Sequence, residues 1–223
     1  MFDSLEVQVI YPTNGSQGLD AAVVHGVSAY NFGAVLRQGW YGTDKVDQAF
    51  QSLDMAAKAR TDEANGAKLA YFPLTPTRRE DAPNPDMVEA YEYYHTPRGQ
   101  RANAPSTAPV RCLAQLATYD AFHNVEIFLT QLLQIIAGSK AGSRWMSEDV
   151  YKRAASKSKN LHIVEGASHV GLYDKPDLVA EAMSNLAPFF KKNLVTQEVT
   201  LPATAGATSE SLGAPGSRPF CGR

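Results

Sequence analysis

The segment from Asn160 to Asp174, NLHIVEGASHVGLYD, constrains the fold of this chain more than any other. Its first residues, NLHIV, are extended and apolar in the manner of a strand inside a sheet. Gly166 and Ala167 then allow a sharp turn, and Pro176 is well placed to begin a helix. The order of strand, glycine turn, histidine and helix predicts an α/β sheet with His169 at the carboxyl end of one strand.

His169 is the candidate catalytic residue of the chain. Open α/β sheets keep their sites outside the carboxyl ends of the strands, and the near-neutral pKa of histidine suits proton transfer. The alternative is a structural histidine that is hydrogen-bonded within its loop. The residues alone leave both interpretations open.

Length and charge limit the classes of protein that fit. At 223 residues and 44% hydrophobic, the chain can bury one sizeable core. A formal net charge of −2 gives no basic field for phosphate backbones or anionic lipid, so we expect no nucleic-acid partner and no membrane association. The two cysteines, Cys112 and Cys221, offer neither a disulfide framework nor a clustered metal site, and we expect no metal and no cofactor.

The first ten residues, MFDSLEVQVI, carry acidic side chains where a secretory signal would carry positive charge. No stretch of the chain approaches about 18 uninterrupted apolar residues, the length that would cross a membrane. Together with the low cysteine content, these features predict a cytoplasmic location.

Two further apolar runs are candidate core strands. Leu19–Val27, LDAAVVHGV, and Leu129–Ala137, LTQLLQIIA, are continuous rather than alternating, as expected for strands that are covered on both faces. We expect the sheet to contain strands near Ala21–Val27, Leu132–Ala137 and Leu161–Val164.

Helices are predicted from apolar residues at helical spacing and from capping residues. One helix runs from about Val46 to a stop at Gly66, and another covers Pro176–Leu194. Shorter helices are expected to begin at capping residues Asp86, Ser106 and Ser147.

The last part of the chain has a different composition. Residues 196–223 are rich in Ala, Thr, Ser, Gly and Pro and offer little apolar surface to offset the entropy of ordering. We expect one folded domain over residues 1–195, followed by a disordered tail.

Several segments together resemble one family. They are AAVVHGVSAYN, RQGWYGT, YYHTPRGQ, IIAGSKAGSRWMSED and, most specifically, IVEGASHVGLYDKPDLV. The chain resembles the C-terminal part of the α/β-hydrolase superfamily, in the branch of dienelactone-hydrolase-like and fungal polyketide-transferase enzymes.

The resemblance implies a partial, mostly parallel sheet flanked by helices, with a helical lid inserted at residues 31–105. It makes His169 the counterpart of the catalytic histidine of the family. It further implies a small apolar acyl or polyketide-type substrate and a role in secondary-metabolite or toxin biosynthesis.

The nucleophile of that family stands on a Gly-x-Ser-x-Gly elbow, upstream of the strand matched here by Ala21–Ser28. Too few residues precede this strand to hold the elbow, so we expect a chain that is shortened at its N-terminal side. The sequence GVSAY imitates an elbow, but Tyr30 replaces its last glycine. We therefore expect Ser28 to lie on a strand and not to be the nucleophile.

The family also has a carboxylate after the strand matched by Leu132–Ala137, where it orients the histidine. Here the loop reads SKAGS, and the first carboxylates are Glu148 and Asp149. Glu148 is a candidate substitute for the acid. The alternative is that both carboxylates stabilise the start of a helix.

Two functions stay open at this point. The first is ester or thioester hydrolysis, or polyketide acyl transfer, with His169 as the base. The second is a catalytically inactive remnant or binding module without a nucleophile. From the incomplete triad we expect the isolated chain to hydrolyse activated esters only very slowly, through His169. An unpaired strand edge would favour self-association or pairing with another chain.

Overall fold

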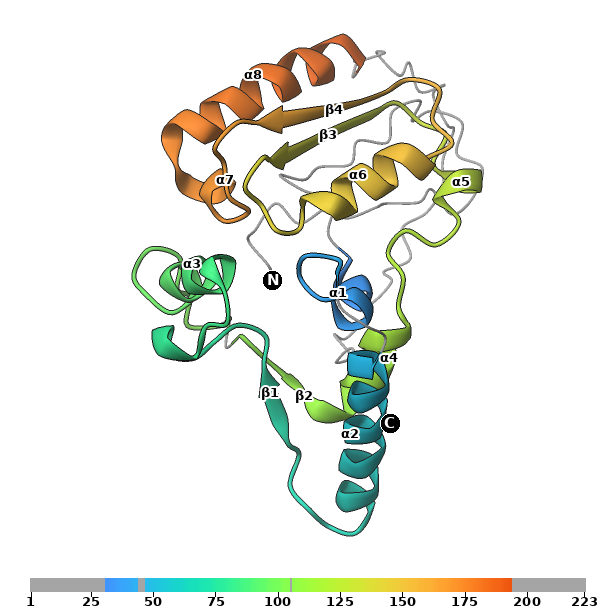
Figure 1. The fold of residues 1–223 in the computed structure, drawn as a ribbon, viewed down its shortest axis with the longest axis vertical. Coiled ribbons are helices and arrows are strands. Elements are labelled where there is room, and N and C mark those ends of the chain that lie inside the picture. Colours follow the sequence, from blue (N-terminus) through green and yellow to red (C-terminus); the bar gives the residue numbers. More distant parts are fainter. Residues whose placement is uncertain (1–30, 44–46, 105, 194–223) are drawn as a thin grey trace, which may run out of the picture.

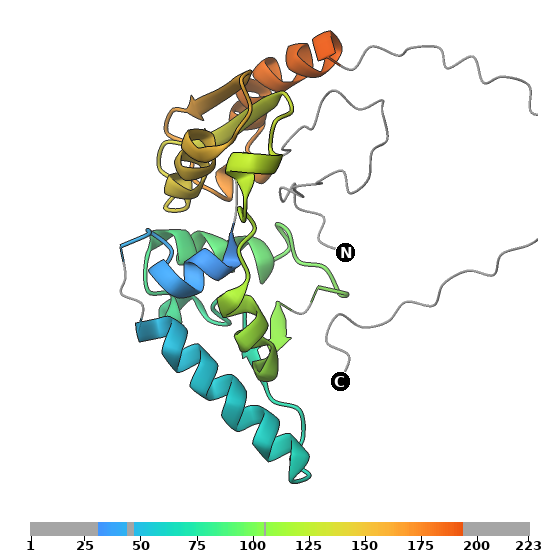
Figure 2. The same cartoon turned by 90° about the vertical axis from the view of Figure 1, so that its right-hand side faces the viewer.

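The computed structural model describes residues 31–43, 47–104 and 106–193. Figure 1 shows two bodies, one above the other. The upper one, residues 125–193, holds a parallel strand pair, and we name it the sheet body. The lower one, residues 31–118, is called the helical body, and its long helix points away from the sheet in Figure 2. The expected strand Ala21–Val27, Ser28 and the tail after Thr196 lie outside the described residues.

The centre of the sheet body is a pair of parallel strands. Strand β3, Leu133–Gly138, pairs with β4, Lys159–Val164, in a register that sets Leu133 beside Lys159 and Gly138 beside Val164. The predicted strands Leu132–Ala137 and Leu161–Val164 are therefore confirmed. Parallel neighbours need a crossover connection, which α6 provides.

Helices cover both faces of this strand pair, as Figure 1 shows. Ile135 of β3 packs with Met146 of α6, whereas Ile136 packs with Leu172 and Ala182 on the side of α7 and α8. Because both faces are covered, every residue of β3 is buried, and its exposure does not alternate along the strand. The helices of this body are α5 (Val125–Phe128), α6 (Arg144–Arg153), α7 (Gly171–Asp174) and α8 (Pro176–Asn193).

The helical body is built from short elements around one long helix. Its elements are α1 (Phe32–Gln38), α2 (Asp47–Ala64), β1 (Tyr71–Pro73), η1 (Arg79–Asp81), α3 (Pro85–Tyr94), β2 (Thr107–Pro109), η2 (Val110–Cys112) and α4 (Leu113–Thr118). Strands β1 and β2 pair antiparallel, and α2 packs against α1 and α4. The helical body thus continues past residue 105 to the end of α4.

The predicted helix from Val46 to Gly66 and the predicted helix Pro176–Leu194 are confirmed by α2 and α8. Gly66 follows α2 with a φ of 92°, a backbone conformation that suits glycine at the end of a helix.

Three predicted helix starts are wrong. Helix α3 is capped by Asn84, whose Oδ1 accepts from Met87 N at 3.0 Å, because Pro85 at the first position is already fixed in a helical conformation. Ser106 has a φ of 52° and precedes β2 instead of a helix. Helix α6 begins at Arg144, so the buried Ser147 lies inside it.

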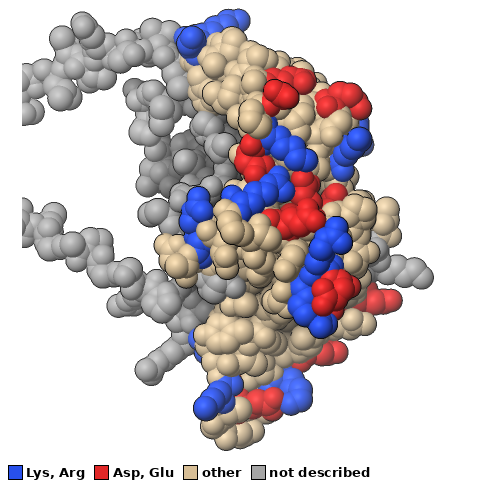
Figure 3. Space-filling view, turned by 90° about the vertical axis from the view of Figure 1, so that its left-hand side faces the viewer, with Lys and Arg blue, Asp and Glu red and all other residues tan. Residues whose placement is uncertain are grey.

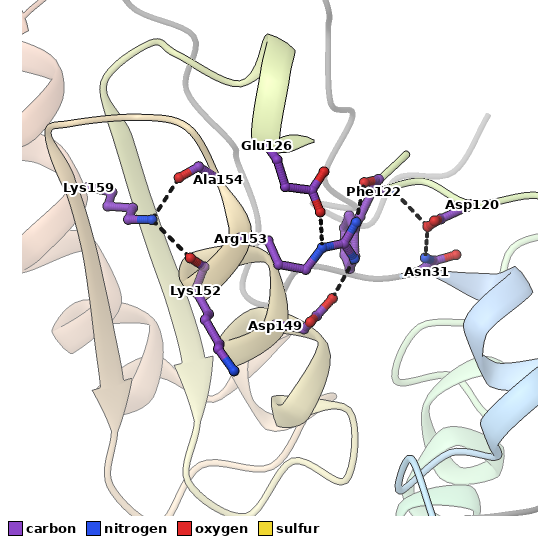
Figure 4. Close-up of polar contacts among 9 residues, drawn as sticks. All are labelled: Asn31, Asp120, Phe122, Glu126, Asp149, Lys152, Arg153, Ala154 and Lys159. Carbon is purple, nitrogen blue, oxygen red and sulfur yellow. Dashed lines mark hydrogen bonds and ion pairs between the residues drawn. The ribbon is translucent and has the colours of Figure 1, made fainter. Parts of the chain in front are cut away.

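Polar contacts join the segments between the two bodies, as Figure 4 shows. Asn31, the N-cap of α1, donates from Nδ2 to Asp120 Oδ1 at 2.6 Å, and Phe122 N donates to the same oxygen at 2.9 Å. Arg153 at the end of α6 bonds Glu126 at 2.5 Å, Asp149 at 2.8 Å and the Phe122 carbonyl at 3.0 Å. These contacts fix the segment that leads from α4 into the sheet body.

The surface carries charges of both signs. Figure 3 shows the face on which α3 and α7 lie, with basic and acidic side chains interspersed. Among the described residues, no helix combines the length and the apolar character that a bilayer crossing requires.

Candidate functional site

The site lies where the loops after β3 and β4 meet. Their main chains bond directly, since Ser139 N donates to Val164 O at 3.0 Å and Lys140 N donates to Ala167 O at 2.9 Å. A Cβ on Gly138 would come within 2.3 Å of Ala167 O, so the two backbones approach as closely as a glycine permits. This contact sets the position of the loop that carries His169.

The imidazole of His169 has a hydroxyl at each ring nitrogen. Ser143 Oγ lies 2.7 Å from Nδ1, and Tyr173 Oη lies 2.7 Å from Nε2. Ser143 is fully buried and comes from the loop after β3, whereas Tyr173 stands on α7, one turn beyond the histidine. Two hydrogen bonds, one from the loop after β3 and one from α7, thus fix the orientation of the ring.

The helical body contributes an aromatic side chain and a carboxylate to the same place. The indole of Trp40 meets the His169 ring edge to face, with centroids 5.3 Å apart and planes at 73°. Trp40 Nε1 donates to Asp86 Oδ2, and Gly142 N donates to the same oxygen at 2.7 Å. Trp145 Nε1 donates to Trp40 O at 2.9 Å. Asp86 on α3 therefore connects the helical body to the loop that ends in Ser143.

Gly142 makes room for this carboxylate. A Cβ built at Gly142 would lie 2.5 Å from Asp86 Oδ2 and 2.5 Å from a ring carbon of Trp40. Any side chain at this position would displace both groups. The glycine is therefore needed for the close approach of α3 to the loop after β3.

The environment keeps His169 neutral. Burial lowers the pKa of His169 from 6.5 to about 4, and the negative charges of Asp86 and Glu89 oppose this fall without overcoming it. A neutral imidazole at pH 7 can accept a proton, which a general base requires.

An ionic cluster joins the two bodies beside the site. Arg98 donates to both oxygens of Asp174 at 2.6 Å, and its guanidinium lies 5.4 Å from the centre of the Tyr93 ring. Glu89 on α3 lies 3.9 Å from Arg98 and 3.3 Å from Lys175. The hydrogen bond from Arg98 holds the pKa of Asp174 below its usual range, so the pair is charged at neutral pH. These ion pairs hold α3 against α7.

The structure brings only one of the residues weighed from the sequence into this site. His169 is at its centre, and Ser28 lies outside the described residues. The hypothesis that Glu148 orients His169 is wrong, because Glu148 is exposed and accepts from Arg144 at 2.7 Å, while Ser143 occupies Nδ1.

Sequence reasoning missed four residues of the site, namely Ser143, Tyr173, Trp40 and Asp86. Ser143 and Tyr173 had a usable signal, since one ends the loop where an acid was sought and the other follows the histidine by four residues. Trp40 and Asp86 gave none, because the helical body folds back onto the loop over a long separation in sequence. Among the described residues, no three His, Cys, Asp or Glu side chains gather as metal ligands.

The chain is similar to proteins of two bacteria. No family model matches it. It is 49% identical over 168 residues to the uncharacterized protein YcjY of Escherichia coli strain K12, covering 75% of this chain and 55% of YcjY. It is 30% identical over 172 residues to the uncharacterized protein PA2218 of Pseudomonas aeruginosa, covering 74% of this chain and 44% of PA2218. The chain thus spans about half the length of the curated relatives it matches.

Solved structures show the fold. The crystal structure of hypothetical protein PA2218 from Pseudomonas aeruginosa matches with a TM-score of 0.67 at 25% identity, over 78% of this chain and 53% of that one. DcsB in complex with its substrate analogue matches at 0.57 and 13% identity, over 67% and 53% of the two chains. The α/β hydrolase GrgF from Penicillium sp. sh18 matches at 0.51 and 14%, over 72% and 60%. The expected α/β-hydrolase-like fold is confirmed, while the family branch, the lid and the match to the C-terminal part alone stay predictions.

Proposed function

We propose that this chain carries the histidine-bearing part of an ester- or thioester-cleaving site, with acyl transfer as the related reaction. The observation that supports this most is the 2.7 Å contact between Ser143 Oγ and Nδ1 of His169, at the carboxyl ends of two parallel strands. The contact sets the ring so that Nε2 faces away from the loop after β3. The low pKa of the ring keeps it unprotonated at pH 7, which is the state from which a general base acts.

In this proposal the nucleophile is not assigned to a described residue, and it is a water molecule if the chain supplies none. Its oxygen or sulfur attacks the acyl carbon of the substrate, and its proton passes to Nε2 of His169. The same nitrogen then returns the proton to the leaving oxygen or sulfur, so that the imidazole ends neutral. Tyr173 Oη, which is 2.7 Å from Nε2, has to move aside or share the proton during this cycle.

The helical body would serve as the lid of this site, within a domain that covers residues 1–195. Trp40 packs on the imidazole, and Tyr93 packs on Tyr173 with ring centroids 5.4 Å apart. Such aromatic surface suits a small apolar acyl or polyketide-type substrate. A role in secondary-metabolite or toxin biosynthesis rests on the family resemblance of the sequence alone.

A second candidate function is binding without turnover. It is favoured by the contact of Tyr173 with Nε2, the nitrogen that a nucleophile would have to reach. If Tyr173 stays in place when an acyl compound binds, the site can hold the compound but cannot activate a nucleophile.

Turnover of a p-nitrophenyl ester and of an acyl thioester by the full chain tests the proposal. We expect slow turnover that His169→Ala lowers about 100-fold or to background, since general base catalysis contributes at least that much. His162→Ala is the matched control, because His162 lies on β4 and contacts Glu181 at 3.1 Å.

Two results would decide against the proposal. Equal rates in the wild type and His169→Ala would show that His169 is not the base. Saturable binding of an acyl compound with no turnover would favour the binding function. Turnover that Ser28→Ala removes would instead support the proposal and assign the nucleophile to Ser28, against our expectation from the sequence.

A further inference from the structure

The group at Nδ1 of His169 is a neutral hydroxyl. A carboxylate can only accept a hydrogen bond, so it demands a proton on Nδ1 and leaves Nε2 as the base. The hydroxyl of Ser143 can accept from a protonated Nδ1 or donate to an unprotonated one. Its 2.7 Å contact therefore fixes the position of the ring in either tautomer, but it supplies no charge.

Negative charge reaches the site from another element. The carboxylate of Asp86 enters from α3 through the space that Gly142 leaves, and its Oδ2 accepts from Gly142 N at 2.7 Å and from Trp40 Nε1. The indole that donates to Asp86 is the one that packs on the imidazole. The carboxylate is thus held by Gly142 of the loop after β3 and by Trp40 of the helical body.

We propose that Ser143 and Asp86 divide between them the work that a single acid does in a catalytic triad. Ser143 positions the imidazole through Nδ1, and Asp86 supplies the negative charge that favours a protonated ring. Both act as positioning residues for the base of the proposed function, and the inference rests on that function for its catalytic meaning.

One consequence is that the proton affinity of His169 depends on the position of the helical body. Asp86 and Glu89, whose charges favour protonation, both lie on α3. The other charged groups close by are Arg98, Asp174 and Lys175, in the cluster that holds α3 against α7, and Tyr173 is the titratable group at Nε2. When α3 moves away, the ring loses these negative charges, which favour protonation, and it also loses burial, which opposes protonation.

Nuclear magnetic resonance of the ring nitrogens tests this division directly. The full chain is labelled with ring-¹⁵N histidine, and His169 is assigned by comparison with His169→Gln. The two nitrogen resonances give the ratio of tautomers at pH 7, and an acid titration gives the midpoint of protonation.

Changes at Ser143 test the orienting role. Ser143→Ala should shift the Nδ1 resonance, because this ring nitrogen loses its hydrogen-bond partner. Ser143→Cys places a weaker hydrogen-bond partner at Nδ1 and should give a smaller shift in the same direction. Ser143→Asp should fix the proton on Nδ1 and raise proton affinity about tenfold or more.

Changes at Asp86 test the charge. Asp86→Asn should lower the proton affinity of His169 by about threefold to tenfold, because it removes the charge and keeps the shape. Glu148→Gln is the matched control, since it removes the same charge from an exposed side chain that pairs with Arg144. Ser143→Asp combined with Asp86→Asn should restore the midpoint, because the charge returns at Nδ1.

The inference is overturned if Asp86→Asn moves the midpoint no further than Glu148→Gln does. It is equally overturned if both Ser143→Ala and Ser143→Cys leave the Nδ1 resonance unchanged. These readouts do not depend on turnover. A chain that shows the expected shifts and cleaves no ester would therefore reject the proposed function and keep the division between the two residues.

Discussion

The two bodies of this protein are held together by different means. In the sheet body, the largest buried side chains are branched or long and apolar, and they include Leu133, Ile135, Ile136 and Met146. In the helical body, the buried apolar residues are mostly alanines, while Phe50 and Met55 of α2 are 63% and 50% exposed. Burial of large apolar groups stabilises roughly in proportion to area, so the sheet body gains far more from its core.

The helical body depends more on polar contacts. Arg37 donates to the carbonyl oxygens of Ala117 and Tyr119 at 2.9 and 2.7 Å, and Asn31 donates to Asp120. The ion pair of Arg98 and Asp174 connects it to α7. Because such contacts contribute less than core packing, we expect the helical body to open before the sheet body unfolds. Four predictions test this contrast.

The largest effect is expected in the core of the sheet body. Ile136 is fully buried, and Ile136→Ala should lower the free energy of unfolding by about 2 to 5 kcal/mol in a urea titration. Ile127 on α5 is 62% exposed, so Ile127→Ala should change it by less than about 0.5 kcal/mol. Equal effects at the two isoleucines would contradict the packing described above.

The next effect concerns pH and involves both bodies. The pKa of His169 falls from 6.5 to about 4 on folding, so the unfolded chain binds the proton more readily between these values. Stability should therefore decrease as the pH falls from 6.5 toward 4, by at most about 3 kcal/mol. His169→Gln should flatten this part of the stability curve, measured by denaturant unfolding at each pH. A curve that is the same in both proteins would mean that the ring is not desolvated.

A smaller effect is expected at Asp120, in the segment that connects the helical body with the sheet body. Asp120→Ala removes the acceptor of Asn31 Nδ2 and Phe122 N, and should cost about 1 to 3 kcal/mol. Hydrogen exchange should speed up in α1 more than in β3. Asp62→Ala, which breaks an exposed pair with Lys58, should cost less than about 0.5 kcal/mol. Uniform acceleration across both bodies would refute their separate opening.

The smallest effect should come from the ion pair between the bodies. Arg98 lowers the pKa of Asp174, so the pair stabilises the protein above pH 3.8, and this contribution is lost as the pH falls through the lowered pKa. Asp174→Asn should cost less than about 1 kcal/mol at pH 7 and less still at low pH. Asp54→Asn on the exposed face of α2 controls for net charge. A cost that grows with acid would contradict this sign.

The same contrast between bodies decides what the sequence could predict. The strands of the sheet body and the helices α2 and α8 follow from local patterns of apolar residues and from stops such as Gly66. The predicted starts at Asp86, Ser106 and Ser147 failed because competing local conformations were available.

The site shows the same limit. His169 was found from its strand and turn, which are contiguous in sequence. The contact from Asp86 to Gly142 spans 56 residues and depends on how α3 docks, which no local pattern records. Ser143 was passed over because a carboxylate was sought at that position, and a hydroxyl can take the same place at Nδ1 with different chemistry.

Gly138 restricts which substitutions this protein can accept during evolution. Its missing side chain lets the loop after β3 touch the carbonyl of Ala167. Every amino acid that a single base change can introduce at a glycine codon has a Cβ, which would push the loops of Ser143 and His169 apart. We therefore expect natural variants to show synonymous changes at codon 138 and no nonsynonymous ones, although Gly138 is not itself a residue of the site.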